Sequence, residues 1–288
     1  MLDQAQRLRQ MAVNNSEKTL PTSKPRIITV TSGKGGVGKS NIVVNVSIAL
    51  QKMGKKVMIF DADIGMGNDD ILMGCSSRYN VFDVISKGKE IEDVVLTGPF
   101  GVKLLPGGSA LTRVEDLTEI QRDIFLNKLT SLTGLDYIIM DTGAGVNKSV
   151  LGFIACCEDL VIVTTPEPTS LTDAYSLLKA VKHFNIKNSA KVIINRSLDN
   201  NEADLTFHKF DSAVTKFLHM KLEYLGKISE DKKLSYAVRA QQPVIVSYPN
   251  SEAAKDINRI AGKIEGMKVK VNGMGVEGLF KKIFSIFS

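Results

Sequence analysis

A glycine-rich run near the start of the chain ends in a lysine and a serine, and these residue types at this spacing bind phosphate. The run reads Gly33-Lys34-Gly35-Gly36-Val37-Gly38-Lys39-Ser40 and is followed by Asn41. It matches the pattern G-x-x-x-x-G-K-S, in which the glycines let backbone N–H groups wrap around a triphosphate. We expect Lys39 to reach the β- and γ-phosphates and the Ser40 hydroxyl to ligate Mg²⁺. The run therefore predicts a site for a nucleoside triphosphate with Mg²⁺.

Acidic residues follow two apolar runs that have the character of strands. Asp61 and Asp63 end the first run, and Asp141 ends the second. Because parallel strands end at the edge of the sheet where the phosphate loop lies, these carboxylates are expected to face the same crevice. One carboxylate there orients an attacking water, and others support Mg²⁺. Taken singly, each also suits a helix cap or a turn, but the three together favour a metal-dependent site.

Strand-like and helical segments alternate from about residue 26 to residue 265. This alternation predicts an α/β fold with a mostly parallel, doubly wound sheet covered by helices on both faces. The expected strands are 26–31, 56–60, 102–105, 136–140, 159–164, 190–194 and 222–226. The expected helices are 40–52, 116–132, 147–156, 170–184, 205–219 and 252–265.

Composition narrows the class of protein further. The 288 residues are 43% hydrophobic and 24% charged, and no apolar run approaches the ~20 residues that span a bilayer. With no apolar signal-peptide core at the N-terminus, we expect a cytoplasmic protein. The net charge of +6 lies mostly at the two ends, so the nearly neutral centre disfavours general or sequence-specific nucleic-acid binding. The three cysteines form no C-x-x-C pair, which argues against an iron–sulfur carrier.

These motifs resemble those of the deviant Walker A ATPases, the family that includes MinD, ParA and the nitrogenase iron protein. The resemblance is carried by Lys34 within the phosphate loop, by Asp61-Ala62-Asp63 and by the segment 139–145. It implies a P-loop ATPase fold of the MinD type over residues 26–265, with ATP and Mg²⁺ as cofactors. Slow ATP hydrolysis is implied as well, because proteins of this family act as timers rather than as bulk ATPases. It also implies an ATP-bound homodimer in which Lys34 contacts the nucleotide of the facing subunit.

The same resemblance implies roles for single residues. Asp63 positions the attacking water, and Asp61 and Asp141 support the Mg²⁺ shell. Asn195 follows a late strand and contacts adenine in this scheme. The segment that includes Glu230 is expected to close over the base, although it has serine where proline is common in the family.

The C-terminal segment 276–288 has one apolar side when drawn as a helix. At about 100° per residue its apolar residues fall within an arc of ~160°. They are Val276, Leu279, Phe280, Ile283, Phe284, Ile286 and Phe287. Behind the glycine-containing tether 266–275, this pattern favours a membrane-targeting helix that inserts into an anionic interface. A helix that docks on the core or on a dimer partner is the alternative.

The N-terminal segment 1–25 reads by itself as a frayed helix and a flexible tether. Its first residues nevertheless resemble the D-Q-A-x-x-L-R element of the flagellar branch of the family, known as FlhG, FleN or YlxH. That resemblance implies that Gln4, Leu8 and Arg9 contact and activate a GTPase of the FlhF type. It further implies a regulator of flagellar number and placement, reversibly bound at the inner face of the membrane, with flagellar switch (C-ring) components as partners. A septum-site MinD or a ParA-type partitioning ATPase remains the alternative.

Overall fold

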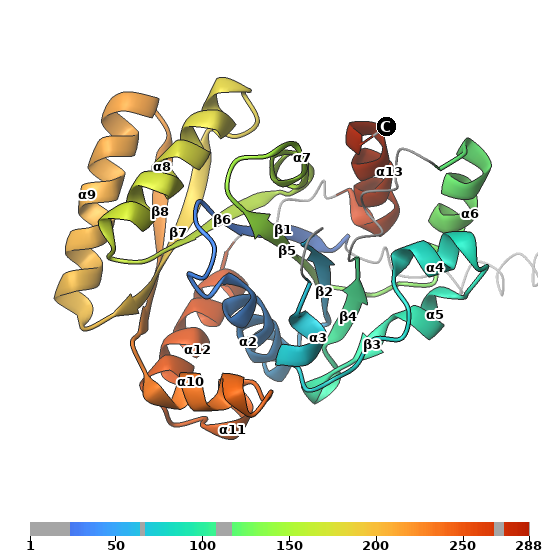
Figure 1. Ribbon diagram of the computed structural model, residues 1–288, viewed down its shortest axis with the longest axis horizontal. Helices are drawn as coiled ribbons and strands as arrows, with labels where there is room; N and C mark the ends of the chain where they lie inside the picture. The colour runs from blue at the N-terminus through green and yellow to red at the C-terminus, as the bar shows by residue number, and fades with distance from the viewer. Residues whose placement is uncertain (1–23, 64–66, 108–116, 268–273, 288) are drawn as a thin grey trace, which may run out of the picture.

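The computed structural model describes residues 24–63, 67–107, 117–267 and 274–287. The expectations for Gln4, Leu8 and Arg9 lie outside these residues. Within them, the chain forms an eight-stranded sheet with helices on both faces (Figure 1).

The sheet has the strand order β3-β4-β2-β5-β1-β6-β7-β8. All neighbouring pairs are parallel except β3 with β4. The strands are β1 (Arg26–Ser32), β2 (Val57–Ala62), β3 (Leu96–Thr97), β4 (Lys103–Pro106), β5 (Tyr137–Ala144), β6 (Asp159–Thr164), β7 (Ser189–Ser197) and β8 (Lys221–Ser229). The mostly parallel, doubly wound sheet is therefore confirmed. β1 lies between β5 and β6, and in sheets of this kind ligands bind in the crevice at the carboxyl ends of the central strands.

Helices cover the two faces of the sheet as separate layers (Figure 1). One layer contains α2 (Lys39–Lys52), α10 (Lys232–Arg239), α11 (Val244–Ser247) and α12 (Glu252–Glu265). The other contains α6 (Glu119–Leu129), α7 (Lys148–Cys156), α8 (Pro168–His183), α9 (Asn200–Leu218) and α13 (Gly275–Phe287). Along the chain, β2 and β4 are separated by a segment that contains several short helices: α3 (Asp69–Leu72), α4 (Val81–Ser86), α5 (Ile91–Val94) and η1 (Pro99–Gly101). Each face of the sheet buries its own apolar cluster.

The helix ends differ from the sequence expectations for local reasons. Thr118 forms a capping box with Gln121, so α6 begins later than expected. Asp199 caps α9 by accepting a hydrogen bond from Glu202 N, and α9 therefore begins at residue 200 instead of 205. Pro168 supplies the first residue of α8, which extends that helix toward its N-terminus.

The terminal helix α13 is docked on the protein and not detached from it. Leu279, Phe280 and Ile283 are completely buried, and Phe284 is nearly so. The Phe280 ring lies 5.1 Å from the rings of Phe60 on β2 and Phe125 on α6. Burial of each such side chain stabilises a fold by about 1.5–3 kcal/mol.

The polar side of α13 also contacts the body of the protein. Lys282 donates a hydrogen bond to the carbonyl oxygen of Ala155 at the end of α7. The expectation that Leu279, Phe280, Ile283 and Phe284 form an accessible membrane face is thus corrected for this conformation, because a groove between α6 and α7 buries them. The Phe287 side chain lies outside the described structure. No helix among the described residues is both long and apolar enough to cross a bilayer.

Candidate nucleotide-binding site

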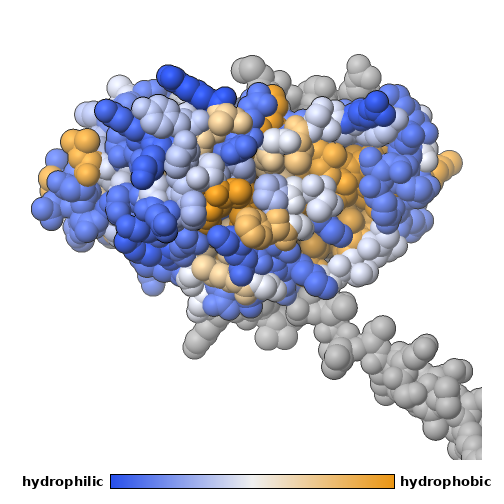
Figure 2. All heavy atoms as spheres, turned by 90° about the horizontal axis from the view of Figure 1, so that it is seen from below, coloured by the Kyte–Doolittle hydropathy of each residue, from blue (hydrophilic) through white to orange (hydrophobic). Residues whose placement is uncertain are grey.

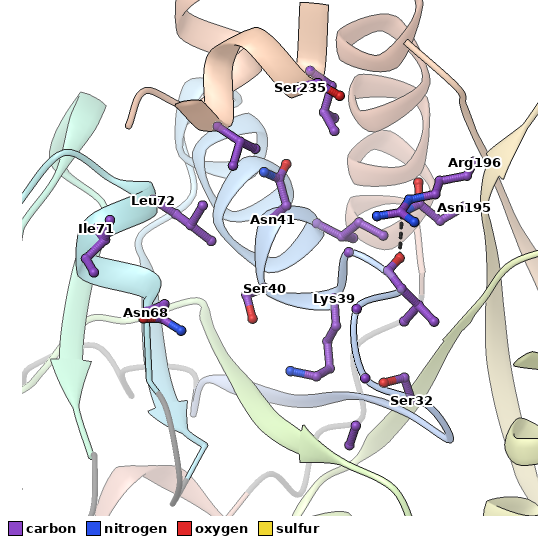
Figure 3. A pocket seen from close by; sticks show the side chains of 18 of the residues that line it. Ser32, Lys39, Ser40, Asn41, Asn68, Ile71, Leu72, Asn195, Arg196 and Ser235 are labelled. Carbon is purple, nitrogen blue, oxygen red and sulfur yellow. Dashed lines mark hydrogen bonds between the residues drawn. The ribbon is translucent and has the colours of Figure 1, made fainter. Parts of the chain in front are cut away.

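A cavity of about 780 Å³ lies at the carboxyl ends of the central strands, above the phosphate loop (Figure 3). Gly35 through Ile42 line its floor. Its other walls come from Asp63, from Asn68, Ile71 and Leu72 around α3, from Asn195 and Arg196 at the end of β7, and from Leu234, Ser235, Val238, Arg239 and Gln241 in and after α10. The sequence thus brings most of the expected phosphate-loop residues to one cavity.

The face of the molecule seen from below in Figure 2 is mostly hydrophilic, with apolar side chains gathered around its hollowed middle. Two apolar side chains that line the cavity, Ile71 and Val238, are 44% and 39% exposed. The cavity therefore combines a polar floor for phosphate with an apolar rim, as a nucleotide with a flat base requires.

Backbone geometry explains the glycines of the loop. Gly38 precedes α2 with φ +89°, a conformation that favours glycine over other residues. A Cβ on Gly33 would lie 2.1 Å from the backbone carbonyl carbon of Asp173, so the loop packs directly on α8. Gly33 and Gly38 thus fix the backbone that leads into α2. The free N–H groups at the N-terminus of such a helix are suited to binding an anion.

Lys39 is buried at the floor of the site and paired with a buried carboxylate. Its Nζ lies 2.7 Å from Asp141 Oδ1, and the two side chains are 9% and 2% exposed. Burial raises the pKa of Asp141 although the Lys39 charge opposes this. Asp61 is also buried, and burial together with the nearby Asp141 charge raises the pKa of Asp61 to about 7. Behind the lining of the cavity, Asp61 and Asp141 therefore form a buried pair of carboxyl groups, and Lys39 contacts Asp141.

The oxygen atoms of Ser40, Asp61 and Asp141 suit Mg²⁺, which prefers hard oxygen ligands. In the described part of the chain, no group of three or more His, Cys, Asp and Glu side chains is placed to hold a metal ion on its own. Mg²⁺ at nucleotide sites is usually bound by one or two carboxylates together with phosphate oxygens and water. The residues present thus fit an ion that arrives with its nucleotide.

Asp63 lines the cavity beside the phosphate loop. Its backbone N–H donates to Asp61 Oδ1 at 3.1 Å, which ties the two acidic residues together. A Cβ on Gly143 would lie 3.4 Å from Asp63 Oδ1, so this carboxylate approaches the backbone after β5 closely. The position is compatible with orienting a water at the phosphate end of the cavity.

Lys34 is not among the residues that line the cavity of its own subunit. Its Nζ donates to Glu167 Oε2 at 3.0 Å and to the Thr169 hydroxyl at 3.2 Å. Glu167 has no signal in the sequence beyond its place directly before Pro168 at the start of α8.

Asn195 lines the cavity, and its Nδ2 donates to the carbonyl oxygen of Val37 at 2.7 Å (Figure 3). Glu230 lines a neighbouring cavity with Thr165 and Arg196, and Arg196 lines both cavities. The contacts of Asn195 and Glu230 with the base stay predictions.

A buried asparagine that the sequence analysis missed joins the phosphate-loop helix to this wall. Asn45 donates to Asn41 Oδ1 at 3.0 Å and accepts a hydrogen bond from Ile245 N at 3.1 Å. Its signal in the sequence is a polar residue within the apolar run of α2, a run that also contains Ser47. The link fixes α11, and with it the end of α10, against the helix that follows the phosphate loop.

Comparison with known proteins agrees with this geometry. A ParA family model, described as the NUBPL iron-transfer P-loop NTPase, matches residues 24–265. The antiactivator FleN of Pseudomonas aeruginosa is 34% identical over 251 residues, which are 87% of this chain and 90% of that protein. The flagellum site-determining protein YlxH of Helicobacter pylori is 32% identical over 293 residues, covering 98% of each chain. The solved MinC:MinD cell division complex of Aquifex aeolicus matches with a TM-score of 0.65 at 26% identity, over 85% of this chain and 97% of that one.

Proposed function

Because the chain belongs to the ParA/MinD family of P-loop ATPases, we propose that it is an ATP-dependent, dimerising switch that regulates flagellar number and placement. Similarity to FleN and YlxH over most of the chain supports the flagellar role. The observation that carries the proposal is that the two lysines of the phosphate loop occupy different positions relative to the cavity. Lys39 lines the cavity, whereas Lys34 does not line it and pairs with Glu167 at the surface, so we infer that Lys34 contacts a facing subunit.

The residues of the cavity have distinct tasks in this proposal. Lys39 exchanges Asp141 for the β- and γ-phosphates when ATP binds. Ser40, Asp61 and Asp141 would hold Mg²⁺, which neutralises charge on the phosphates. Asp63 orients the water that attacks the γ-phosphate, and Asn195 contacts adenine.

Membrane association depends on α13 in this proposal. Its apolar side chains Leu279, Phe280, Ile283 and Phe284 are buried in the described conformation, so the helix must leave its groove before it inserts into lipid. Phe287 extends the same apolar arc. A dimer carries two such helices, and their combined binding is far stronger than that of one helix. ATP binding would thus move the protein from the cytoplasm to the inner face of the membrane.

The N-terminal residues Gln4, Leu8 and Arg9 are proposed to activate a GTPase of the FlhF type, with flagellar switch components as further partners. Removal of residues 1–12 tests this function most directly. We expect lost stimulation of FlhF GTP hydrolysis with ATP-dependent dimerisation retained. Unchanged stimulation contradicts the flagellar role.

A septum-site MinD is the second candidate, favoured by the similarity to MinD in the MinC:MinD complex. Co-sedimentation with purified MinC in the presence of ATP separates the two functions. ATP-dependent capture of MinC without any effect on FlhF favours the second candidate.

A further inference from the structure

The helix α6 has apolar side chains on its outer side as well as on the side that faces the protein. Phe125, Leu126 and Leu129 are buried, as the inner side of a surface helix should be. On the outer side, Ile120 and Ile124 are 73% and 47% exposed, and because they lie four residues apart they form one surface patch. A helix that is apolar on two sides is usually covered on both, so this outer patch calls for a partner.

Acidic residues border the outer patch. Glu119 and Asp123 directly precede Ile120 and Ile124 in α6, and both acidic side chains are exposed. Since they also lie four residues apart, they form a row beside the isoleucines. An apolar pair beside an acidic pair fits a segment with apolar and basic side chains, whereas it disfavours an anionic lipid surface.

The start of the described chain lies beside the helix that packs on α6. A Cβ on Gly275, the first residue of α13, would lie 3.8 Å from Lys24 Cγ, so residues 1–23 join the protein at the start of α13. The helices α13 and α6 lie side by side, with the rings of Phe280 and Phe125 in contact (Figure 1). The length of α13 and the width of one helix therefore separate this junction from the outer patch, roughly 20–30 Å in all.

The residues that precede Lys24 have the length and the composition to cover the outer patch. Residues 13–23 alone span up to about 36 Å when extended, which brings residues 1–12 to α6. Residues 1–12 contain both apolar and basic side chains: Leu2, Leu8, Met11, Arg7 and Arg9. Their apolar side chains match the isoleucine pair, and their arginines match its acidic border. Because the segment is tethered to the protein, its high effective concentration makes even a weak contact sufficient.

We propose that residues 1–12 dock on the outer patch of α6, with Leu8 against the isoleucine pair and Arg7 and Arg9 beside its acidic border. The proposal rests on the function proposed above, which assigns Leu8 and Arg9 to the activation of a GTPase. Docking covers these residues while α13 occupies its groove. When α13 leaves, the inner side of α6 loses its packing partner, and the N-terminal segment is released. Activation of the GTPase is thereby confined to the membrane-bound protein.

A single fluorescent reporter tests the docking in the full-length protein. The chain contains no tryptophan, so Met11→Trp introduces one in the N-terminal segment. Acrylamide quenching of this tryptophan is compared between the natural background and a background that carries Ile120→Ser with Ile124→Ser. We expect the quenching constant to rise roughly two- to fivefold in the double variant, as a tethered segment held by a weak contact is released.

Leu205→Ser is the matched control, because Leu205 is 56% exposed on α9 at the opposite end of the sheet (Figure 1). It should leave the quenching constant unchanged. Asp123→Lys tests the same contact by charge and should also release the reporter, even if the double isoleucine variant does not fold. Equal quenching in the natural background and in both α6 variants overturns the proposal.

Two further measurements separate the other outcomes. If a second copy of the chain covers the outer patch, sedimentation velocity without nucleotide shows a dimer that the isoleucine variant loses, and quenching of the reporter stays equal; this result also overturns the proposal. Stimulation of FlhF GTP hydrolysis without ATP or membranes should be stronger for the isoleucine variant than for the wild type. Release of the reporter without stimulation of FlhF by either protein supports the docking and contradicts the GTPase function alone.

Discussion

The ammonium group of Lys34 lies 3.0 Å from the carboxylate of Glu167 in the same subunit. Both side chains are partly exposed, at 39% and 57%, so the ion pair is a surface interaction of at most about 1 kcal/mol. The ion pair keeps the Lys34 side chain outside the cavity of its own subunit. Because the ion pair is weak, Lys34 is easily displaced from Glu167. In the proposed dimer, the triphosphate of the partner subunit would compete with Glu167 for this lysine.

Glu167→Gln should therefore promote ATP-dependent dimerisation modestly. Loss of the ion pair releases Lys34, and we expect up to about a fivefold lower dimer dissociation constant. Analytical ultracentrifugation with ATP and Mg²⁺ measures this change. Lys34→Ala is the opposing variant and should abolish the dimer while ATP still binds the monomer. Equal dimerisation of Lys34→Ala and the wild type would show that Lys34 has no role across the interface.

Asp63→Ala should accumulate an ATP-bound dimer. Without a carboxylate to orient the attacking water, hydrolysis is expected to slow by about 10²-fold or more while nucleotide binding persists. Size-exclusion chromatography with ATP and Mg²⁺ gives the measurement, and ADP serves as the control. If the variant stays monomeric under conditions that dimerise the wild type, Asp63 does not have this role.

Phe125→Ala should loosen α13 without changing the apolar side of the helix itself. Phe125 is completely buried and contacts both Phe280 and Phe284, so its truncation opens the groove and costs about 3–5 kcal/mol of folding stability. We expect more co-sedimentation with anionic liposomes in the absence of ATP.

Phe207→Ala is a matched control for this experiment, because Phe207 stacks on Tyr224 at the far edge of the sheet. It should not increase liposome binding. Truncation after Gly275 should remove the binding altogether, and persistent ATP-dependent binding of the truncated chain would exclude α13 as the membrane contact.

The nucleotide-free protein should lose stability as pH rises through the range in which Asp61 ionises. The pKa of Asp61 is about 7 in the folded protein against an ordinary 3.8, so the folded state holds this proton more tightly than the unfolded state. The stabilisation is complete below pH ~4 and is lost as pH rises to about 7. Relative to Asp61→Asn, the wild type should lose about 2–4 kcal/mol of unfolding free energy between pH 4 and 7.5. Urea unfolding at several pH values measures the difference, and parallel curves for the two proteins would contradict it.

The sequence predicted the sheet and a glycine-rich loop that lines a cavity, because both rest on local patterns. Runs of apolar residues mark buried strands. A phosphate loop binds phosphate through its backbone, so the spacing of its residues is enough to recognise it. The expected strands all occur, but β3 has two residues and α3 has four, which is too short for any periodicity.

Two other features needed tertiary structure. An apolar helix face has the same pattern whether it meets lipid or a groove, so the sequence of α13 did not distinguish the membrane from its site between α6 and α7. The ion pair of Lys34 joins residues 133 positions apart, and no local signal marks Glu167 as its partner.

Phe60 and Asp61 are consecutive residues of β2. Phe60 contacts the ring of Phe280 on one face of the sheet, while Asp61 belongs to the buried pair of carboxyl groups at the strand end. Because successive side chains of a strand point to opposite faces, a small rotation of this strand end re-aims both side chains together. The buried carboxyl pair that includes Asp61 and the groove that holds α13 are thus joined through adjacent residues of one strand, a rise of ~3.3 Å apart along β2.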